Sequence, residues 1–150
     1  MKLIAPLFSL TALTFLVMVN FCLADTLPIK KSTQGIAYVT GGISDEEVEA
    51  LRPYAKKFSL HFVFSEGASG RSITDIDVNI YNTDSKLVFK TIKAQPQLFV
   101  DLPAGIYTVV AKYNENKQRY KFELAANEHK KIILNWKNLT DEDAADEETQ

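Results

Sequence analysis

The fold of this protein is decided by residues 102–111, LPAGIYTVVA, where a Pro/Gly turn runs directly into a strand-like segment. Pro103 fixes φ for the first corner of a turn, and Gly105 provides a backbone that can adopt positive φ. Beyond the turn, aromatic and β-branched residues alternate with the period of two that a β-strand requires. We therefore predict a chain reversal followed by a half-buried strand.

The same alternation of apolar and polar residues recurs in other parts of the chain. The clearest segments are residues 58–65, 76–81, 120–124 and 132–136. Polar turns are predicted at residues 82–85, 114–117 and 125–128, and the last of these would pair 120–124 with 132–136 as a hairpin. Regularly spaced strands without helical stretches between them predict an all-β fold, an antiparallel Greek-key-type β-sandwich of about seven strands.

One short helix is predicted near residues 45–57, ahead of most strands. Ser44 is a suitable N-cap, and Glu47 three residues later completes a capping box. Acidic residues in the first turn also favour the positive end of the helix dipole. Pro53 lacks an amide hydrogen and should end or kink the helix near Arg52.

The pattern Leu-Pro-x-Gly-x-Tyr-x-Val-x-Ala at residues 102–111 resembles the carboxypeptidase regulatory-like domains, which belong to the transthyretin-like or prealbumin-like β-sandwiches. Residues 98–136 carry most of this resemblance, and the strand, turn and strand at 76–89 add to it. Residues 38–64 are similar to uncharacterised exported bacterial proteins. The resemblance implies a sandwich of about seven strands that acts as an accessory, binding or adhesive module. The His-x-x-Glu zinc motif of the peptidases that carry such domains is absent from the sequence.

The N-terminus has the form of a secretory signal peptide over residues 1–24. Lys2 is followed by an almost wholly apolar stretch, and small residues precede a predicted cleavage site between Ala24 and Asp25. Cleavage would remove Cys22, the only cysteine, and would leave a periplasmic or secreted protein with no membrane span. Two alternatives are an uncleaved anchor and a lipoprotein acylated at Cys22, and the polar Asn20 disfavours both.

The remaining chain divides into three predicted parts. Residues 25–35 are a flexible lead-in, 36–138 the β-sandwich domain, and 139–150 a disordered acidic tail. The tail holds six acids and no base, so 13 acids face 16 bases between residues 25 and 140. This tail is either a solvated extension or a segment that folds back on a basic surface of the domain.

No catalytic, cofactor or metal site is predicted from residue spacing. His61 and His129 are the only histidines, and a metal site would need both of them together with distant carboxylates. The Asp75-x-Asp77-x-Asn79 sequence begins like a calcium loop, but it lacks the glycine and the final glutamate of that loop. Export and the scattered arrangement of lysines also argue against a nucleic acid as partner.

The favoured function is a non-catalytic binding or accessory module of the bacterial cell envelope, whose partner is an unknown envelope protein or glycan. The candidate contact loop covers residues 66–72, with Glu66, Ser69 and Arg71 as contact residues. Tyr81 and Phe99 are further candidates, as exposed aromatic residues.

Two other functions remain open. One is an envelope hydrolase that uses an acid pair such as Asp75 and Asp77. The other is a structural subunit that assembles through an edge strand.

Overall fold

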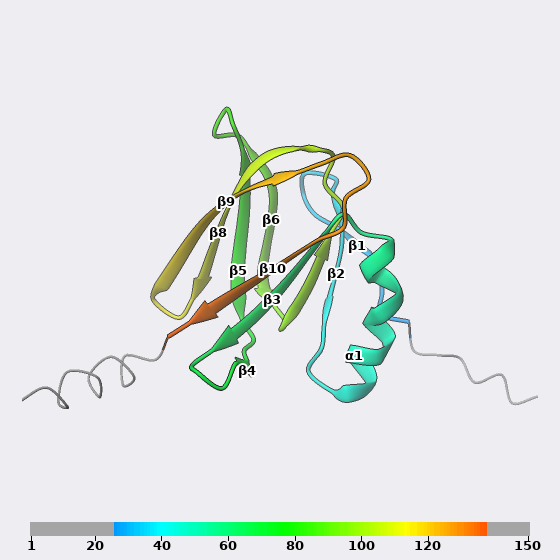
Figure 1. Cartoon of the computed structure of the whole chain (residues 1–150), viewed down its shortest axis with the longest axis vertical. Helices are drawn as coiled ribbons and strands as arrows, with labels where there is room; N and C mark the ends of the chain where they lie inside the picture. The colour runs from blue at the N-terminus through cyan, green and yellow to red at the C-terminus, as the bar shows by residue number, and fades with distance from the viewer. Residues whose placement is uncertain (1–25, 138–150) are drawn as a thin grey trace, which may run out of the picture.

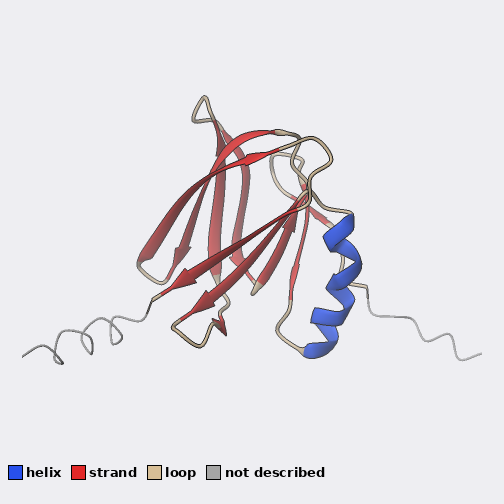
Figure 2. Ribbon diagram, in the orientation of Figure 1, coloured by secondary structure: helices blue, strands red, loops and turns tan. Residues whose placement is uncertain are grey.

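A computed structural model describes residues 26–137, which form two packed β-sheets and one short helical segment (Figure 1, Figure 2). The chain is thus a β-sandwich, as the alternating pattern predicts. The predicted signal peptide, its cleavage between Ala24 and Asp25, and the predicted tail at 139–150 lie outside the described residues.

The two sheets differ in size. Sheet A has six strands in the order β1-β2-β7-β3-β10, with β4 paired to β3. Its strands are β1 (Lys30–Lys31), β2 (Ala37–Gly41), β7 (Gln97–Val100), β3 (Leu60–Glu66), β10 (Lys130–Trp136) and β4 (Arg71–Ser72). Sheet B has four strands in the order β6-β5-β8-β9. These are β6 (Leu87–Ala94), β5 (Ile76–Asn82), β8 (Gly105–Tyr113) and β9 (Asn116–Leu124).

The main core lies between the sheets and is built from the apolar members of each alternating segment. Phe62 and Phe64 of β3 face Phe89, Ile80 and other fully buried residues of sheet B. A large apolar side chain contributes about 1.5–3 kcal/mol when it is fully buried. The period of two in the sequence therefore indicates correctly which face of each strand is buried.

The predicted hairpin between residues 120–124 and 132–136 is wrong. Strand β9 pairs with β8, whereas β10 crosses to sheet A and lies parallel to β3, with Ile132 opposite Phe62. The crossover is fixed at the start of β3, where Lys130 N donates to Ser59 O at 2.9 Å. A ring nitrogen of His129, Nδ1, also lies 2.7 Å from Phe58 O. Alternation specifies the buried face of a strand but not its partner, so the sequence pattern could not distinguish the two pairings.

The helical segment begins as predicted and covers part of the outer face of sheet A (Figure 1). Helix α1 (Asp45–Leu51) continues into the 3₁₀ segment η1 (Arg52–Lys56), where Pro53 lies. Ser44 Oγ accepts from Glu47 N at 3.3 Å, and the Glu47 carboxylate accepts from the amides of Gly42 and Ile43. The segment packs against β2 and β7 through a second apolar cluster: Val39, Leu51, Tyr54, Phe58 and Phe99.

Two predictions from the sequence are wrong in this part of sheet A. Phe99 is only 1% exposed, so its prediction as a surface aromatic residue is wrong. The lead-in at 25–35 was expected to be flexible, but β1 pairs with β2, and the carbonyl of Leu27 accepts from Tyr54 Oη at 2.8 Å. Sheet A therefore begins before residue 36.

The turn before β8 holds the tyrosine that follows it. Tyr107 Oη donates to Pro103 O at 2.7 Å, and burial raises the pKa of this hydroxyl, which keeps it a donor. Gly105 is not among the glycines with positive φ, contrary to the expectation from sequence. Gly105 instead lets the Tyr107 side chain lie close to the backbone, because a Cβ at Gly105 would lie 3.3 Å from Tyr107 Oη.

We predict that Tyr107→Phe lowers the free energy of unfolding by about 1 kcal/mol, the usual net value of one lost hydrogen bond. Urea denaturation followed by fluorescence measures it. Tyr120→Phe is the matched control, because Tyr120 is 48% exposed and should change stability little. Equal effects of the two substitutions would contradict this role of the Tyr107 hydroxyl.

Candidate functional site

The outer face of sheet B carries an excess of positive charge. Its four strands contain two acids, Asp77 and Glu123, and six bases: Lys90, Lys93, Lys112, Lys117, Arg119 and Lys121. Five of these bases point outward, as the alternation with buried neighbours shows, and Tyr81 lies on the same side of the sheet. We call Lys90, Lys112, Lys117, Arg119, Lys121 and Tyr81 the basic face.

The pairing of β8 with β9 brings the cations of these two strands next to one another. Lys112 of β8 lies directly opposite Lys117 of β9, and Arg119 is opposite Val110. Adjacent strands are about 4.8 Å apart, so Lys112 of β8 joins Lys117, Arg119 and Lys121 of β9 in one patch. Lys112 and Lys117 repel each other, while Asp77 of β5 lies opposite Lys112 on its other side. The three cations of β9 have no acid directly opposite them, which makes a bound anion favourable there.

Little of this charge is neutralised within the described residues. The only ion pair of residues 26–137 that involves the basic face joins Lys112 Nζ to Glu115 at 3.9 Å, between side chains that are 39% and 96% exposed. Such an exposed pair contributes little. The basic face therefore retains a positive potential.

A groove of about 230 Å³ lies at one end of the basic face. It is lined by residues of the β5–β6 turn, among them Asn82 and Ser85, and by Ile106, Thr108 and Lys121. The turn is well held, because Asn82 Oδ1 accepts from the amides of Asp84 and Lys86 at 3.0 Å each. The groove thus combines a cation with hydroxyl groups at a defined position.

The sequence contains a signal for this surface in the spacing of three cations, which no motif includes. Lys117, Arg119 and Lys121 occupy every second position of one strand, which places all three on one face. The count of bases over residues 25–140 showed a mildly basic domain but not where the charge gathers. That position depends on which strands pair, which the alternation alone does not specify.

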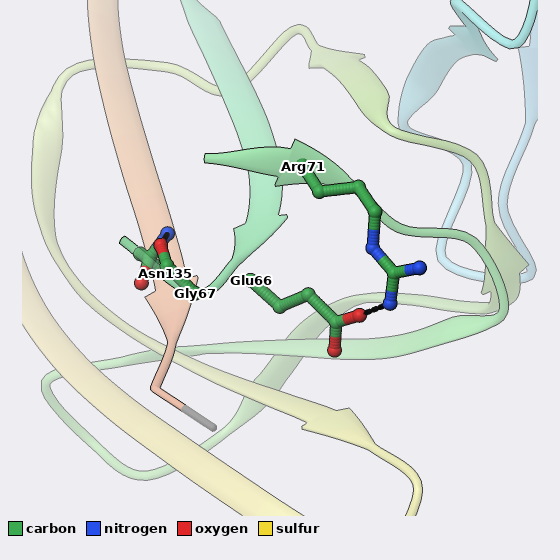
Figure 3. Close-up of polar contacts among 4 residues, drawn as sticks. All are labelled: Glu66, Gly67, Arg71 and Asn135. Carbon is green, nitrogen blue, oxygen red and sulfur yellow. Dashed lines mark hydrogen bonds and ion pairs between the residues drawn. The ribbon is translucent and has the colours of Figure 1, made fainter. Parts of the chain in front are cut away.

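The predicted contact loop at 66–72 is a tight hairpin between β3 and β4. Glu66 pairs with Arg71 in the register, and Gly67 and Gly70 have positive φ between them. Glu66 is only 7% exposed, so it is not a surface contact residue, whereas Ser69 and Arg71 are exposed. Figure 3 shows the Arg71 guanidinium reaching the Glu66 carboxylate, with which it forms an ion pair.

The hairpin is also attached to the neighbouring strand. Asn135 Nδ2 of β10 donates to Ser65 Oγ at 2.9 Å and to Gly67 O at 3.1 Å. The amide of Gly67 in turn donates to Trp136 O at 2.8 Å. These contacts give Glu66 and Arg71 a structural role at this end of the sandwich.

We predict that Arg71→Met lowers the free energy of unfolding by about 1–3 kcal/mol, because it leaves the Glu66 carboxylate buried without a partner. Adding Glu66→Gln to Arg71→Met should restore part of the loss. Chemical denaturation of the two single variants and the double variant gives the coupling. Strictly additive effects would show that the pair does not contribute.

The candidate acid pair of the hydrolase alternative lies on the surface. Asp75 and Asp77 are exposed; Asp75 accepts from Thr74 Oγ1 at 3.3 Å and Asp77 from the Lys93 amide at 3.1 Å. Neither lines the groove beside Lys121. Both carboxylates are therefore engaged in local contacts at the surface, and neither lines a groove described for residues 26–137.

A second groove, of about 420 Å³, places Ser59, Asp101 and His129 near one another. The Ser59 hydroxyl accepts from Leu102 N and donates to Leu102 O, both at 2.8 Å. No hydrogen bond within residues 26–137 joins Ser59 to His129. Ser59 and His129 therefore each bond to backbone groups and link the loops at this end of the sandwich.

His61 lies on the outer face of sheet A. Its ring stacks on Phe99 with centroids 4.0 Å apart, and Nε2 lies 3.0 Å from Gln97 Oε1. Burial lowers the pKa of His61 below its ordinary value of 6.5; Lys131 adds to this, and the contact with Gln97 opposes it. In the described part of the chain, no three His, Cys, Asp or Glu side chains are grouped as metal ligands.

This pKa shift predicts how stability depends on pH. Below pH 6.5 the unfolded chain binds the proton before the folded protein does, so the free energy of unfolding falls until the pH passes the lower pKa of the folded state. Against a His129→Gln reference, adding His61→Gln should reduce the loss of stability between about pH 7.5 and pH 5.5. Chemical denaturation of both variants at the two pH values measures this loss. An equal loss of stability in the two variants would contradict the lowered pKa of His61.

Comparison with known proteins assigns the chain to no family. No protein-family model matches the chain, and no curated protein is significantly similar to it. Among solved structures it is similar to 5-hydroxyisourate hydrolase of Klebsiella pneumoniae, with a TM-score of 0.41 and 13% identity over 55% of this chain and 89% of that one. It is also similar to the Bacillus anthracis TIE protein, with a TM-score of 0.37 and 21% identity over 53% of this chain and 16% of that one. No helix within residues 26–137 is long and apolar enough to cross a membrane.

Proposed function

We propose that this protein is an exported, non-catalytic binding module of the bacterial cell envelope that binds a carboxylate-rich glycan or protein surface through its basic face. The observation that carries the proposal is the patch of four cations, one on β8 and three on β9, with only Asp77 and Glu123 as acids in the strands of sheet B. The signal-like N-terminus supports export. The pattern at residues 102–111 supports the finer assignment to the transthyretin-like or carboxypeptidase regulatory-like sandwiches.

The shape of the basic face suits an extended anionic ligand. A sheet presents side chains at regular intervals, about 6.8 Å between alternate residues along a strand and about 4.8 Å between strands. A polymer with repeated carboxylates contacts several cations at once, so weak individual attractions add up. Tyr81 and the groove beside Lys121 offer additional contacts to such a ligand.

We predict that the protein binds polyglutamate or polygalacturonate, and that Arg119→Glu combined with Lys121→Glu weakens this binding at least tenfold. Two favourable charge contacts become repulsive in this variant. Isothermal titration at low salt measures the affinity, and the two polymers distinguish a peptide-like from a glycan-like ligand. Binding should weaken as salt rises, because exposed charges are screened.

The control variant carries the same charge change elsewhere. Lys30→Glu combined with Lys31→Glu replaces two exposed cations on β1 of sheet A, at the opposite edge of that sheet from β10. It should bind both polymers as the unchanged protein does. Equal weakening in the two variants would show that net charge alone governs binding, and no binding to either polymer would overturn the proposal.

A further inference from the structure

We propose that the acidic segment at residues 138–150 binds to the basic face of its own chain and occupies it until a ligand displaces it. The docking stands on its own observations, and its effect on ligand access rests on the proposed function. Three features of the chain carry it: where the segment begins, the charge that it brings and the distance that it can cover.

The described chain ends beside the basic face. Gln118 Nε2 of β9 donates to Asn135 O at 2.6 Å, and Trp136 Nε1 of β10 donates to Asn116 O at 3.2 Å. These bonds hold the end of β10 against the first residues of β9, as the approach of these two strands in Figure 1 also shows. Because β9 is the outermost strand of sheet B, only its edge separates Lys137 from the basic face.

The charges of the two surfaces are complementary. The segment holds six acids and no base, in two runs at residues 141–143 and 146–148. Within residues 26–137, Lys90, Lys117, Arg119 and Lys121 take part in no ion pair. Three of these cations lie on β9, the strand nearest to the point where the segment begins, and Lys90 lies on β6 at the far edge of the sheet.

The segment is long enough to cross the whole face. The 13 residues after Lys137 reach about 40 Å when extended. The four strands of sheet B span about 15 Å. Each acidic run can therefore lie over the cations of β9 and β8 while the chain remains attached at β10.

Because the segment is covalently attached to the domain, weak ion pairs are enough to keep it on the basic face. A tethered segment has an effective concentration in the millimolar range, so contacts too weak for a free peptide are populated within the chain. A polymer with many more carboxylates would displace the tethered segment from the basic face. The segment would then set a threshold for binding and would disfavour small or weakly charged anions.

Zero-length carbodiimide cross-linking tests the docking directly. We expect the full chain after Ala24 to form amide bonds between acids of residues 141–148 and Lys117, Lys121 or Lys112, identified by mass spectrometry. A mixture of ¹⁵N-labelled and unlabelled protein distinguishes bonds within one chain from bonds between chains. The cross-links should diminish from about 0.02 M to about 0.5 M salt.

Lys30 and Lys31 are internal controls, since both are exposed on β1 of sheet A. Cross-links to them as frequent as those to the basic face, or none to the basic face, would overturn the proposal. Cross-links between chains alone would also overturn it, in favour of association between copies.

A full-length variant with the six acids replaced by Asn or Gln separates this proposal from the proposed function. If both hold, this variant binds polyglutamate several-fold more tightly than the unchanged chain. Cross-links to the basic face without binding of either polymer would support docking and overturn the proposed function. Polymer binding that the six replacements leave unchanged would support the proposed function and overturn the competitive role of the segment.

Discussion

Strand β3 is fully buried on its inner face, partly buried on its outer face and paired on both edges, and the rest of the structure depends on this constraint. Phe62 and Phe64 fill the core between the sheets, while β7 and β10 pair with its two edges. A strand with so much apolar surface requires cover on each side. The parallel placement of β10 covers one edge, and the helical segment, packed on the adjoining Phe99, covers part of the outer face.

The helical segment covers part of sheet A, and no helix of residues 26–137 lies over the outer face of sheet B, which meets solvent (Figure 2). A solvated face needs polar side chains, and mixed charges would meet that need without repulsion. The pairing of Lys112 opposite Lys117 costs stability that a mixed pair would not cost. Solubility therefore explains why the face is charged, but it does not explain why one sign predominates.

The sequence predicted the sandwich and the helix because both depend on local patterns. Alternation around Phe62 and Val109 identifies buried faces, and Ser44 with Glu47 marks the helix start. The partner of β10 was not predictable, because the same alternation suits a hairpin or a crossover. Gly105 shows a similar limit: its closeness to Tyr107 depends on side-chain packing, which the turn pattern does not contain.

The candidate site was less predictable than the fold for the same reason. Glu66 and Arg71 look like residues of a polar surface loop, but the hairpin buries the carboxylate and gives the pair a structural role. The basic face requires strand pairing to bring Lys112 beside Lys117. The end of β10 is held against β9, so the acidic part of the sequence begins beside the basic face. A chain of the same composition with its acids spread through the strands would have neither an open basic face nor a segment suited to cover it.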